Sequence, residues 1–475
     1  MNQFHIFSAD FQTNAQNMDS QLRVQESFDL VIREAKLGAR RLRMYFVDGF
    51  VKDAILTNIL TFLMQLSEEK TTAPQTTREF ADVCLNYIET EVTGETAAFQ
   101  KAIFSGMIGL LVEGFSEAIL IDARVYPVRQ VAEPENDKVL MGPHEGFVET
   151  LIFNTALIRR RIRDANLTIS LHQIGERSKT DVALCYLNGK APDKTVRALQ
   201  EKLADIHINA LTMGQESLTE LLVPKQWYNP FPKVRYTERP DAAAASISEG
   251  SVIILVDNSP AAIIIPTGFF DFLQDTNDYF LSPFMGSYLR LMRLIIFFLT
   301  VFLAPAWYLL MKYPQVIPEW LEFVGVSEEI VLPIVFQFLI IEMVIDALKL
   351  ASLNTPSALS NSFSVVGALV LGDFAVRAGW FNPEVVLYMA FIAIANFTQT
   401  NFELGYALKV SRILLVVLTG LFSLWGFLGG LLLLFLLLIT TKTVTGRCYL
   451  YPIIPCNPKK LGTLLFRKPI NRDNC

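Results

Sequence analysis

Charged residues are scarce in this sequence. Only 19% of the 475 residues are charged, whereas 52% are apolar and the mean hydropathy is +0.35. This balance excludes disordered and collagen-like chains, because the former are rich in charge and the latter carry glycine at every third position. The chain has enough apolar residues to bury a core, and more of them than an ordinary soluble domain.

Residues that bring chemistry are also few. The cysteines form no CxxC pair and the four histidines are scattered, so we expect neither a disulfide framework nor a zinc site. No phosphate-binding loop, GxSxG elbow, dinucleotide fingerprint or helical metal motif occurs, and Ser259 lies among turn formers with no histidine nearby. We therefore expect no enzyme, no cofactor, no metal and no nucleic-acid partner. We interpret the cysteines as ordinary thiols in a reducing compartment; they are Cys84, Cys185, Cys448, Cys456 and Cys475.

Charge is divided unevenly along the chain. Residues 285–475 hold 14 Lys and Arg against 10 Asp and Glu, a net charge of +4, whereas residues 1–284 hold 27 against 37, a net charge of −10. The long apolar runs lie in the basic second part. The acidic first part is long enough for one or two globular domains. The sequence therefore predicts a soluble region followed by a membrane domain.

The first part alternates strand and helix patterns, which indicates an α/β region of two lobes. Apolar runs predict strands at Leu42–Val47, Ala118–Ala123 and Asp181–Leu187, and amphipathic spacing predicts helices at Ile55–Leu66, Glu79–Glu91, Phe147–Arg163 and Pro192–Asp205. Further on, Val252–Val256 and Ala261–Ile265 flank Asp257-Asn258-Ser259-Pro260, which predicts a β-hairpin.

Proline-rich and charged stretches suggest the boundaries between domains. We expect a flexible N-terminus over residues 1–20, a first lobe over 21–135, a second lobe over 136–235, a connector with the β-hairpin over 236–288, a membrane domain of four to six helices over 289–442 and a basic C-terminal tail over 443–475. Met1–Asp10 shows no basic segment followed by an apolar one, so no secretory signal is expected and the two lobes are expected in the cytoplasm.

Five apolar segments are candidates for membrane-spanning helices of an all-α polytopic domain. They are Leu291–Met311, Ile330–Leu348, Ser360–Trp380, Pro383–Thr400 and Ser411–Thr440. The first would extend about 31 Å as a helix, close to the thickness of the hydrocarbon layer. The last would extend about 45 Å, so it must tilt, protrude or break at Gly426, Gly429 or Gly430. The number of crossings stays open between four and six.

Lysine and arginine near the ends of these segments predict the orientation. Arg290 and Arg293 precede the first segment, the next loop is acidic, and we interpret Lys349, Lys409 and Arg412 as residues of later inside loops. The N-terminal region is therefore expected inside. The C-terminal tail is also basic, yet five crossings would place it outside, so either one segment is re-entrant or the last one is a hairpin.

Ionisable residues within the apolar segments need partners, because a charge in hydrocarbon costs at least about 2.5 kcal/mol. Helical spacing predicts that Asp373 pairs with Arg377 and Asp346 with Lys349. Glu342 has no cation at such a spacing, so it must be protonated, lie near water or meet another helix. We therefore take Glu342 as the leading functional candidate among the intramembrane acids Glu342, Asp346 and Asp373.

The third segment has one face of small and partly polar residues. At 100° per residue this sector contains Ser357, Ser360, Asn361, Ser364, Gly367, Ala368, Leu371, Ala375 and Ala378, with Asp373 opposite. One interpretation is close helix packing through small residues, as Gly426-x-x-x-Gly430 suggests for the last segment. The other is a pore lining in which Leu371 forms an apolar constriction. Both interpretations remain open from the sequence pattern.

Several longer motifs resemble those of the GerA-type spore germination proteins. They are Met141-Gly-Pro-His-Glu-Gly-Phe-Val-Glu149, Leu157-Ile-Arg-Arg-Arg-Ile162, Glu249-Gly-Ser-Val-Ile-Ile-Leu-Val-Asp-Asn-Ser-Pro260, Gly286-Ser-Tyr-Leu-Arg290 and Asn401-Phe-Glu-Leu-Gly-Tyr-Ala-Leu408. The resemblance runs from about residue 25 to the end. The short N-terminus and Arg235-Tyr-Thr-Glu-Arg-Pro240 are more similar to the SpoVAF-type branch than to the nutrient-receptor A subunits.

The resemblance implies a protein of the spore inner membrane whose relatives form ring-shaped oligomers. These are thought to be pentameric channels that release monovalent cations during germination. It also implies membrane lipid and a transporter-fold partner similar to the B subunit of the germinant receptors, which work with a lipoprotein C subunit. On this basis the pore lining becomes the favoured interpretation of the Ser364 face.

Two alternatives to a channel stay open. The chain could be a non-conducting scaffold that docks other germination proteins, or a component that helps to move dipicolinic acid; inverted internal repeats would favour transport, and none is found in residues 285–475. Two positions also depart from the family pattern. Asn258 replaces a common glycine, which asparagine tolerates well, and Thr400 replaces a common proline, which leaves the backbone after the fourth segment in question.

Overall fold

The computed structural model describes residues 6–51, 53–85, 89–124, 142–223, 226–326, 331–354, 375–399 and 401–467. Contacts between residues divide the chain into two units. Unit 1 contains Met1–Pro224 and Val234–Thr267, and unit 2 contains Lys225–Lys233 and Gly268–Cys475. Between the two pieces of unit 1 the chain thus makes a nine-residue excursion into unit 2.

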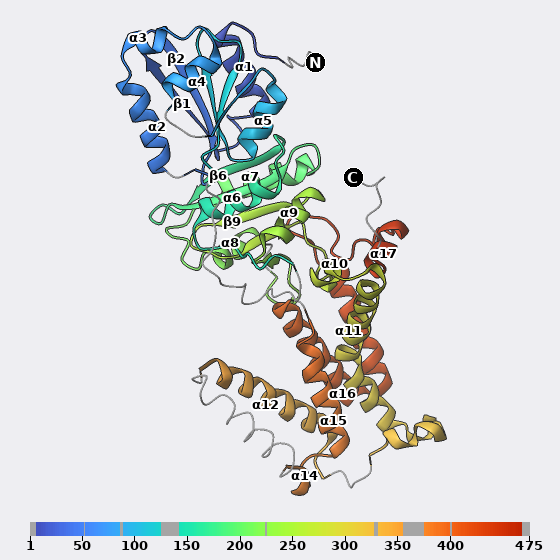
Figure 1. Ribbon diagram of the computed structural model, residues 1–475. Helices are drawn as coiled ribbons and strands as arrows, with labels where there is room; N and C mark the ends of the chain where they lie inside the picture. Colours follow the sequence, from blue (N-terminus) through green and yellow to red (C-terminus); the bar gives the residue numbers. More distant parts are fainter. Residues whose placement is uncertain are drawn as a thin grey trace. The chain divides into compact units, whose positions relative to one another are not determined.

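The first lobe of unit 1 is a five-stranded sheet with helices packed on it (Figure 1). Its elements are α1 (Phe11–Leu22), β1 (Leu30–Leu37), β2 (Arg40–Val47), α2 (Asp53–Gln65), α3 (Glu68–Thr72), α4 (Thr77–Cys84), β3 (Thr90–Thr93), α5 (Thr96–Phe104), β4 (Ile108–Val112) and β5 (Ala118–Ile121). The strand order is β1-β2-β4-β5-β3 and every pair is antiparallel.

Two predictions for this lobe need correction. Residues expected in a flexible N-terminus form α1, which is capped by the Asp10 carboxylate and buries Phe11 and Met18 in the core of the lobe. The helix predicted over Glu79–Glu91 ends at Cys84, and the strand β3 begins at Thr90. The buried apolar residues of α1, Phe11, Ala15, Met18 and Leu22, recur at helical spacing, and Asp10 caps the helix, so both signals were available in the sequence.

The second lobe repeats the plan with a second antiparallel sheet. Its elements are α6 (Leu151–Arg161), β6 (Leu167–Ile174), β7 (Thr180–Leu187), α7 (Asp193–Ala204), α8 (Gln215–Leu222), β8 (Arg235–Thr237), α9 (Pro240–Ser248), β9 (Val252–Val256) and β10 (Ala262–Ile265), with strand order β6-β7-β9-β10-β8. The predicted hairpin is confirmed as β9 and β10. At its turn Asn258 has a φ of 62°, which explains why a glycine or asparagine is needed there.

A buried ion pair connects the two lobes. Arg159 of α6 and Asp29, which precedes β1, are 0% and 1% exposed. The guanidinium donates to both carboxylate oxygens, at 2.8 and 3.0 Å, and to the Ser27 hydroxyl at 3.0 Å. It also donates to the backbone carbonyls of Asp164 and Leu167. A charge pair so completely removed from water is stable only with this degree of hydrogen bonding, so it fixes one lobe against the other.

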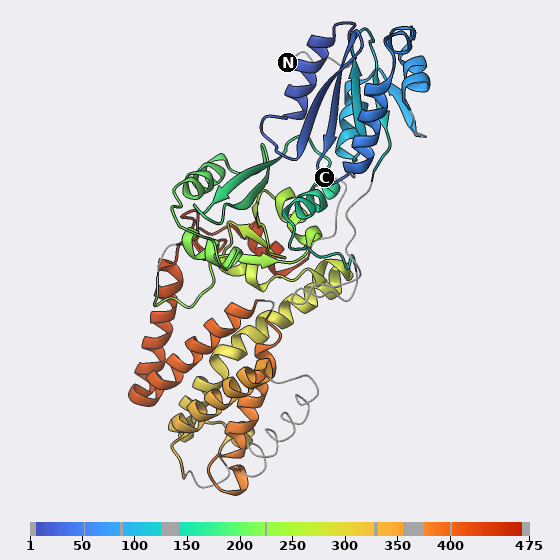
Figure 2. The same ribbon diagram turned by 90° about the vertical axis from the view of Figure 1, so that its left-hand side faces the viewer.

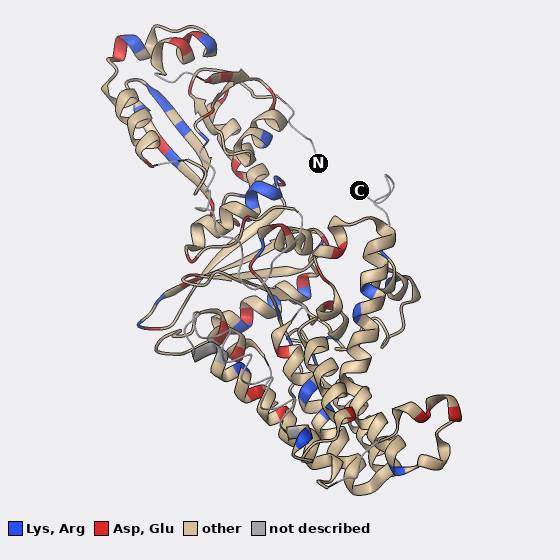
Figure 3. Ribbon diagram, turned by 60° about the horizontal axis from the view of Figure 1, so that its bottom comes forward, with Lys and Arg blue, Asp and Glu red and all other residues tan. Residues whose placement is uncertain are grey.

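Unit 2 is helical. Its elements are η1 (Phe269–Leu273), α10 (Asn277–Phe280), α11 (Pro283–Lys312), η2 (Pro314–Val316), η3 (Glu319–Val324), α12 (Ile334–Asn354), α14 (Ala375–Arg377), α15 (Pro383–Asn396), α16 (Phe402–Thr440) and α17 (Pro458–Leu465). Among the described residues α11 and α16 are long and apolar enough to cross a membrane, and α15 is a shorter apolar helix. Charged side chains are sparse along these helices (Figure 3).

Helix α16 is not straight but turns back on itself. Ser423 has φ 54° and ψ −129°, which is not helical, and it separates the helix into two arms. A Cβ on Gly426 would lie 1.9 Å from the carbonyl oxygen of Leu418, and one on Gly430 2.7 Å from Leu415, so the second arm packs on the first where the two meet. The V of the two arms is visible in Figure 2. The predicted break therefore exists, but at Ser423 rather than at a glycine, and the glycines serve close packing.

The hairpin returns the chain to the end of unit 2 where α16 begins. Tyr449 and Leu450, which follow the second arm, share a buried core with Leu404 and Leu408 of the first. At the opposite end, the Lys312 ammonium at the end of α11 donates to the carbonyls of Thr419 and Gly420 at 2.9 and 2.7 Å, and to the Ser423 hydroxyl. A lysine thus caps the first arm where its backbone carbonyls lose their helical partners.

Candidate functional site

Four ionised side chains meet in the middle of the helical unit. Glu342 and Asp346 come from α12, and Lys409 and Arg412 from the first arm of α16. Arg412 donates to Glu342 through Nε at 2.7 Å and also through Nη2, and Lys409 Nζ lies 3.2 Å from the second Glu342 oxygen. The same ammonium forms an ion pair with Asp346. We call these residues, Glu342, Asp346, Lys409 and Arg412, the α12–α16 charge cluster.

The charge cluster is mostly buried. Glu342, Lys409 and Arg412 are 5%, 6% and 3% exposed, whereas the side chain of Asp346 is 38% exposed. Arg412 Nη1 also donates to the carbonyl of Thr300 in α11 at 2.8 Å, which connects a third helix. A small void beside Glu342 and Arg412 is lined by apolar side chains of α11, α12, α15 and α16. In such surroundings two acids and two bases are stable because they neutralise one another.

These contacts decide between the alternatives for Glu342: it meets another helix. They also correct two predictions. Lys409 and Arg412, interpreted as loop residues, are buried within a helix, because positive charges near an apolar run can pair internally as well as face water. Asp346, predicted to pair with Lys349, pairs with Lys409; the Lys349 ammonium lies over the rings of Phe397 and Tyr406, at 5.0 and 5.8 Å.

The predicted pore lining cannot be located relative to the charge cluster. Ser357, Ser360, Asn361, Ser364, Gly367, Ala368 and Leu371, together with the acid Asp373 and the departing position Thr400, lie outside the described residues. Helix α12, which carries Glu342 and Asp346, ends at Asn354, directly before that segment. The structure thus brings together two of the three predicted acids and places them on the helix that leads into the predicted lining.

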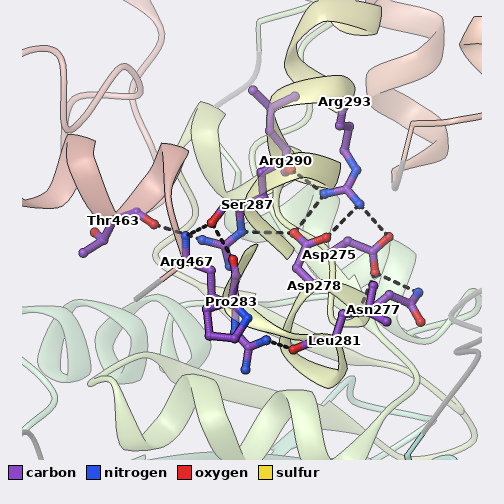
Figure 4. Close-up of polar contacts among 11 residues, drawn as sticks. Asp275, Asn277, Asp278, Leu281, Pro283, Ser287, Arg290, Arg293, Thr463 and Arg467 are labelled. Atoms are coloured by element: carbon purple, nitrogen blue, oxygen red, sulfur yellow. Dashed lines mark hydrogen bonds and ion pairs between the residues drawn. The ribbon is translucent and has the colours of Figure 1, made fainter. Parts of the chain in front are cut away.

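A second cluster of buried charges was missed by sequence reasoning. It lies where α10 meets the start of α11 (Figure 4). Asp278 is fully buried and accepts from Arg290 Nε at 3.1 Å and from both terminal nitrogens of Arg293 at 3.1 and 3.2 Å. Arg293 also reaches Asp275 at 3.2 Å. The two aspartates and two arginines fix the elbow between the short helix α10 and the long helix α11.

The C-terminal helix α17 is attached to the same elbow. Arg290 Nη1 donates to the carbonyl of Thr463 at 2.9 Å, and the backbone N–H of Arg467 donates to the Ser287 hydroxyl at 3.0 Å. A Cβ on Gly286 would lie 2.5 Å from the carbonyl oxygen of Asp278, so only glycine allows this approach. The motif Gly286–Arg290 could have pointed to the elbow, but nothing in the spacing marks Asp278 as its partner.

The quoted motifs that contain Glu145, Arg160 and Asp257 have structural roles in unit 1. Glu145 pairs with Arg160 and Arg161, and Asp257 accepts from the backbone N–H of Leu151 at 3.1 Å. Burial raises the pKa of the Cys84 and Cys185 thiols, which argues against nucleophilic cysteines there. Within the described ranges no group of three or more His, Cys, Asp or Glu side chains could hold a metal ion.

The arrangement defines a class of protein: an α/β region of two lobes followed by a helical unit with apolar helices of membrane-spanning length and buried ion pairs between helices. Comparison with known proteins identifies the family. A family model described as Bacillus/Clostridium GerA spore germination protein matches residues 17–474. The chain belongs to this family, whose description is that of spore germination proteins and not of enzymes.

Individual relatives agree with that assignment. The chain is 35% identical to stage V sporulation protein AF of Bacillus subtilis over 93% of this chain and 89% of the relative. It is 28% identical to spore germination protein KA of the same organism, over 94% of this chain and 82% of the relative. The crystal structure of the N-terminal domain of the A subunit of the Bacillus megaterium spore germinant receptor GerK3 matches 56% of this chain and 97% of that domain, with 24% identity and a TM-score of 0.43.

Proposed function

We propose that this protein is a channel subunit of the spore inner membrane that releases monovalent cations during germination. The subunits form a ring, with five copies as the expected number. The N-terminal unit lies in the cytoplasm, and the Ser364 face lines the path. The observation that carries the proposal is the α12–α16 charge cluster, because ionised residues buried among apolar helices are a mark of ion and proton pathways.

The two acids of the cluster have different roles in this proposal. Glu342 is neutralised by both Lys409 and Arg412, so it orders α12 against α16 and is not free to attract an ion. Among the described residues Asp346 forms its ion pair with Lys409, keeps more than a third of its side chain exposed and lies nearer in sequence to the predicted lining. An exposed acid near a mouth favours cations over anions. Asp346 is therefore the acid of the cation path.

The distribution of charge supports the orientation. Arg290, Arg293 and Arg467 lie at the end of unit 2 where α11 begins, whereas Glu319 and Glu322 lie in the connection after its other end. The positive-inside rule then favours the α11 start on the cytoplasmic side. Because α16 is a hairpin, the basic tail returns to that side, which removes the conflict that five straight crossings would create.

The proposal also includes partners. Spore germination protein KA is among the relatives, and the motif resemblance is to subunits of germinant receptors, which supports action beside other membrane proteins of the spore. A transporter-fold protein similar to the B subunits is the expected partner. Each channel experiment is therefore carried out with the protein alone and with such a partner.

Potassium efflux from liposomes tests the function. Wild type is compared with Asp346→Asn and Ser364→Leu, and Glu319→Gln, an exposed acid in the connection after α11, is the matched control. We expect efflux from wild type and Glu319→Gln, reduced efflux from Asp346→Asn and none from Ser364→Leu. Full efflux from Asp346→Asn and Ser364→Leu would refute the assigned path. No efflux from correctly inserted, oligomeric wild type would favour the scaffold or the dipicolinic-acid transport component.

A further inference from the structure

The nine-residue segment Lys225–Lys233, which leaves unit 1 and belongs to unit 2, suggests how the protein contacts the membrane surface. This excursion lies between α8 and β8 of the second lobe, and both neighbouring pieces of chain belong to unit 1. Nine residues that leave a domain and return need a reason, because ordering them costs conformational entropy. Two features suggest a reason: the contacts that hold the segment to unit 2, and the aromatic side chains that it exposes.

Three contacts fasten the excursion to unit 2. Asn229 Nδ2 donates to the hydroxyl of Thr441, the C-cap residue of α16, at 2.6 Å. The Tyr449 hydroxyl donates to the carbonyl of Pro232 at 2.5 Å, and Phe231 is buried against the ring of Phe269. Residues 229–232 are therefore held at the level where the apolar helix α16 ends.

The tip of the excursion is closed and presents two aromatic side chains. The Lys233 ammonium donates to the side-chain oxygen of Gln226 at 3.0 Å, which ties the two ends of the loop. Between them Trp227 is 96% exposed and Tyr228 is 56% exposed, with the rings edge to face at 6.1 Å. We call Gln226–Asn229 the aromatic loop. It is held by its base, while its largest apolar side chain, Trp227, points away from the described core and is almost fully exposed.

The end of unit 2 around the loop has the composition of a membrane interface. Arg447 lies over the ring of Tyr451 in the segment that follows α16. Tryptophan and tyrosine concentrate where headgroups meet acyl chains, since one part of each side chain is apolar and the other can hydrogen-bond.

We propose that the aromatic loop is a lipid anchor that inserts Trp227 and Tyr228 between phospholipid headgroups at the end of α16. The inference rests on the membrane insertion of α11 and α16 in the proposed function, but not on ion conduction. It gives the excursion a role: residues that interrupt the second lobe attach the chain to the bilayer surface as well as to unit 2.

Fluorescence quenching by brominated lipids tests the anchor in the full chain. The protein is reconstituted in vesicles of phosphatidylglycerol and phosphatidylethanolamine with bromines near the headgroup or deep in the acyl chains. The emission of wild type minus that of Trp227→Phe isolates Trp227. We expect shallow bromines to quench this emission more strongly than deep ones, and aqueous iodide to leave it unquenched. Subtraction of Trp425→Phe isolates Trp425, which is 80% exposed near the hairpin turn, as a control for insertion.

Any other pattern of quenching would contradict the proposal that the aromatic loop is a lipid anchor. Quenching of Trp227 by iodide but not by lipid bromines would place the loop in water. Protection from both quenchers would mean that a second copy or another protein covers it. If Trp425 also escaped the lipid bromines, the helices would not be inserted and the membrane part of the proposed function would fail. If Trp425 were quenched and Trp227 were not, the anchor alone would fail.

Discussion

Replacing Arg159 should uncouple the two lobes of unit 1. In Arg159→Met the side chain keeps much of its length but loses five hydrogen bonds. The Asp29 carboxylate, 1% exposed, loses its cation and is left, within the described part of the chain, with the Ser27 hydroxyl at 2.7 Å. Removing one partner of a buried pair costs about 3–5 kcal/mol, because the remaining charge stays buried. That corresponds to a loss of protection of roughly a hundredfold or more against opening.

Hydrogen exchange of the full chain in detergent measures this loss. The peptides to follow cover α6 and β6, with α12 peptides of unit 2 as an internal reference. Because the cost comes from the unpaired carboxylate, the double variant Asp29→Leu with Arg159→Met should recover most of the protection. The reasoning is refuted if Arg159→Met changes exchange less than tenfold, or if the double variant exchanges as fast as the single one.

Three further changes test other contacts. Gly286→Ala should destabilise the elbow by about 1–3 kcal/mol, since its methyl would overlap a backbone carbonyl, and a raised proteolysis rate at α17 would report it. Lys312→Met should lose about 1.5–3 kcal/mol from the capped end of the first arm of α16, seen as faster exchange near Ser423 and unchanged exchange in unit 1. Burial lowers the pKa of His172 below its unfolded value of about 6.5, so the unfolded state binds more protons and stability falls as the pH drops below that value. His172→Gln should make this loss shallower in urea unfolding, and the exposed His207→Gln should leave it as in wild type.

Local features of the fold could be predicted from the sequence. The apolar run Leu42–Val47 and the turn residues before Pro260 are signals within a few residues, and β2 and the β9–β10 hairpin lie where these signals predict. The apolar run of Leu291–Met311 likewise predicts the helix α11. A break in α16 was one of three alternatives for its length, and the glycines expected to mark it were the wrong place, because nothing local marks Ser423 for a positive φ.

Contacts between distant segments could not be predicted in the same way. Helical spacing compares a residue only with its own helix, so it pairs Asp346 with Lys349 and leaves Glu342 alone. The actual partners are about 60 to 70 positions away, on α16. The pair of Asp278 with Arg290 could not be predicted either. Arg290 belongs to a quoted motif, but a single buried aspartate produces no periodic pattern in the sequence. Such pairs require the packing of the helices to be known.

The hairpin of α16 has a consequence for topology mapping. With the membrane insertion proposed above, a segment that reverses at Ser423 adds no net crossing, so we expect the residues just before Phe402 and just after Thr440 in the same compartment. A reporter fused to the C-terminus should give the same compartment as one placed in the elbow before α11, because α17 contacts the start of α11, although the 39-residue apolar helix α16 would suggest one more crossing. Counting α16 of this chain as one crossing would therefore place the two ends of the proposed membrane domain on the wrong sides relative to each other.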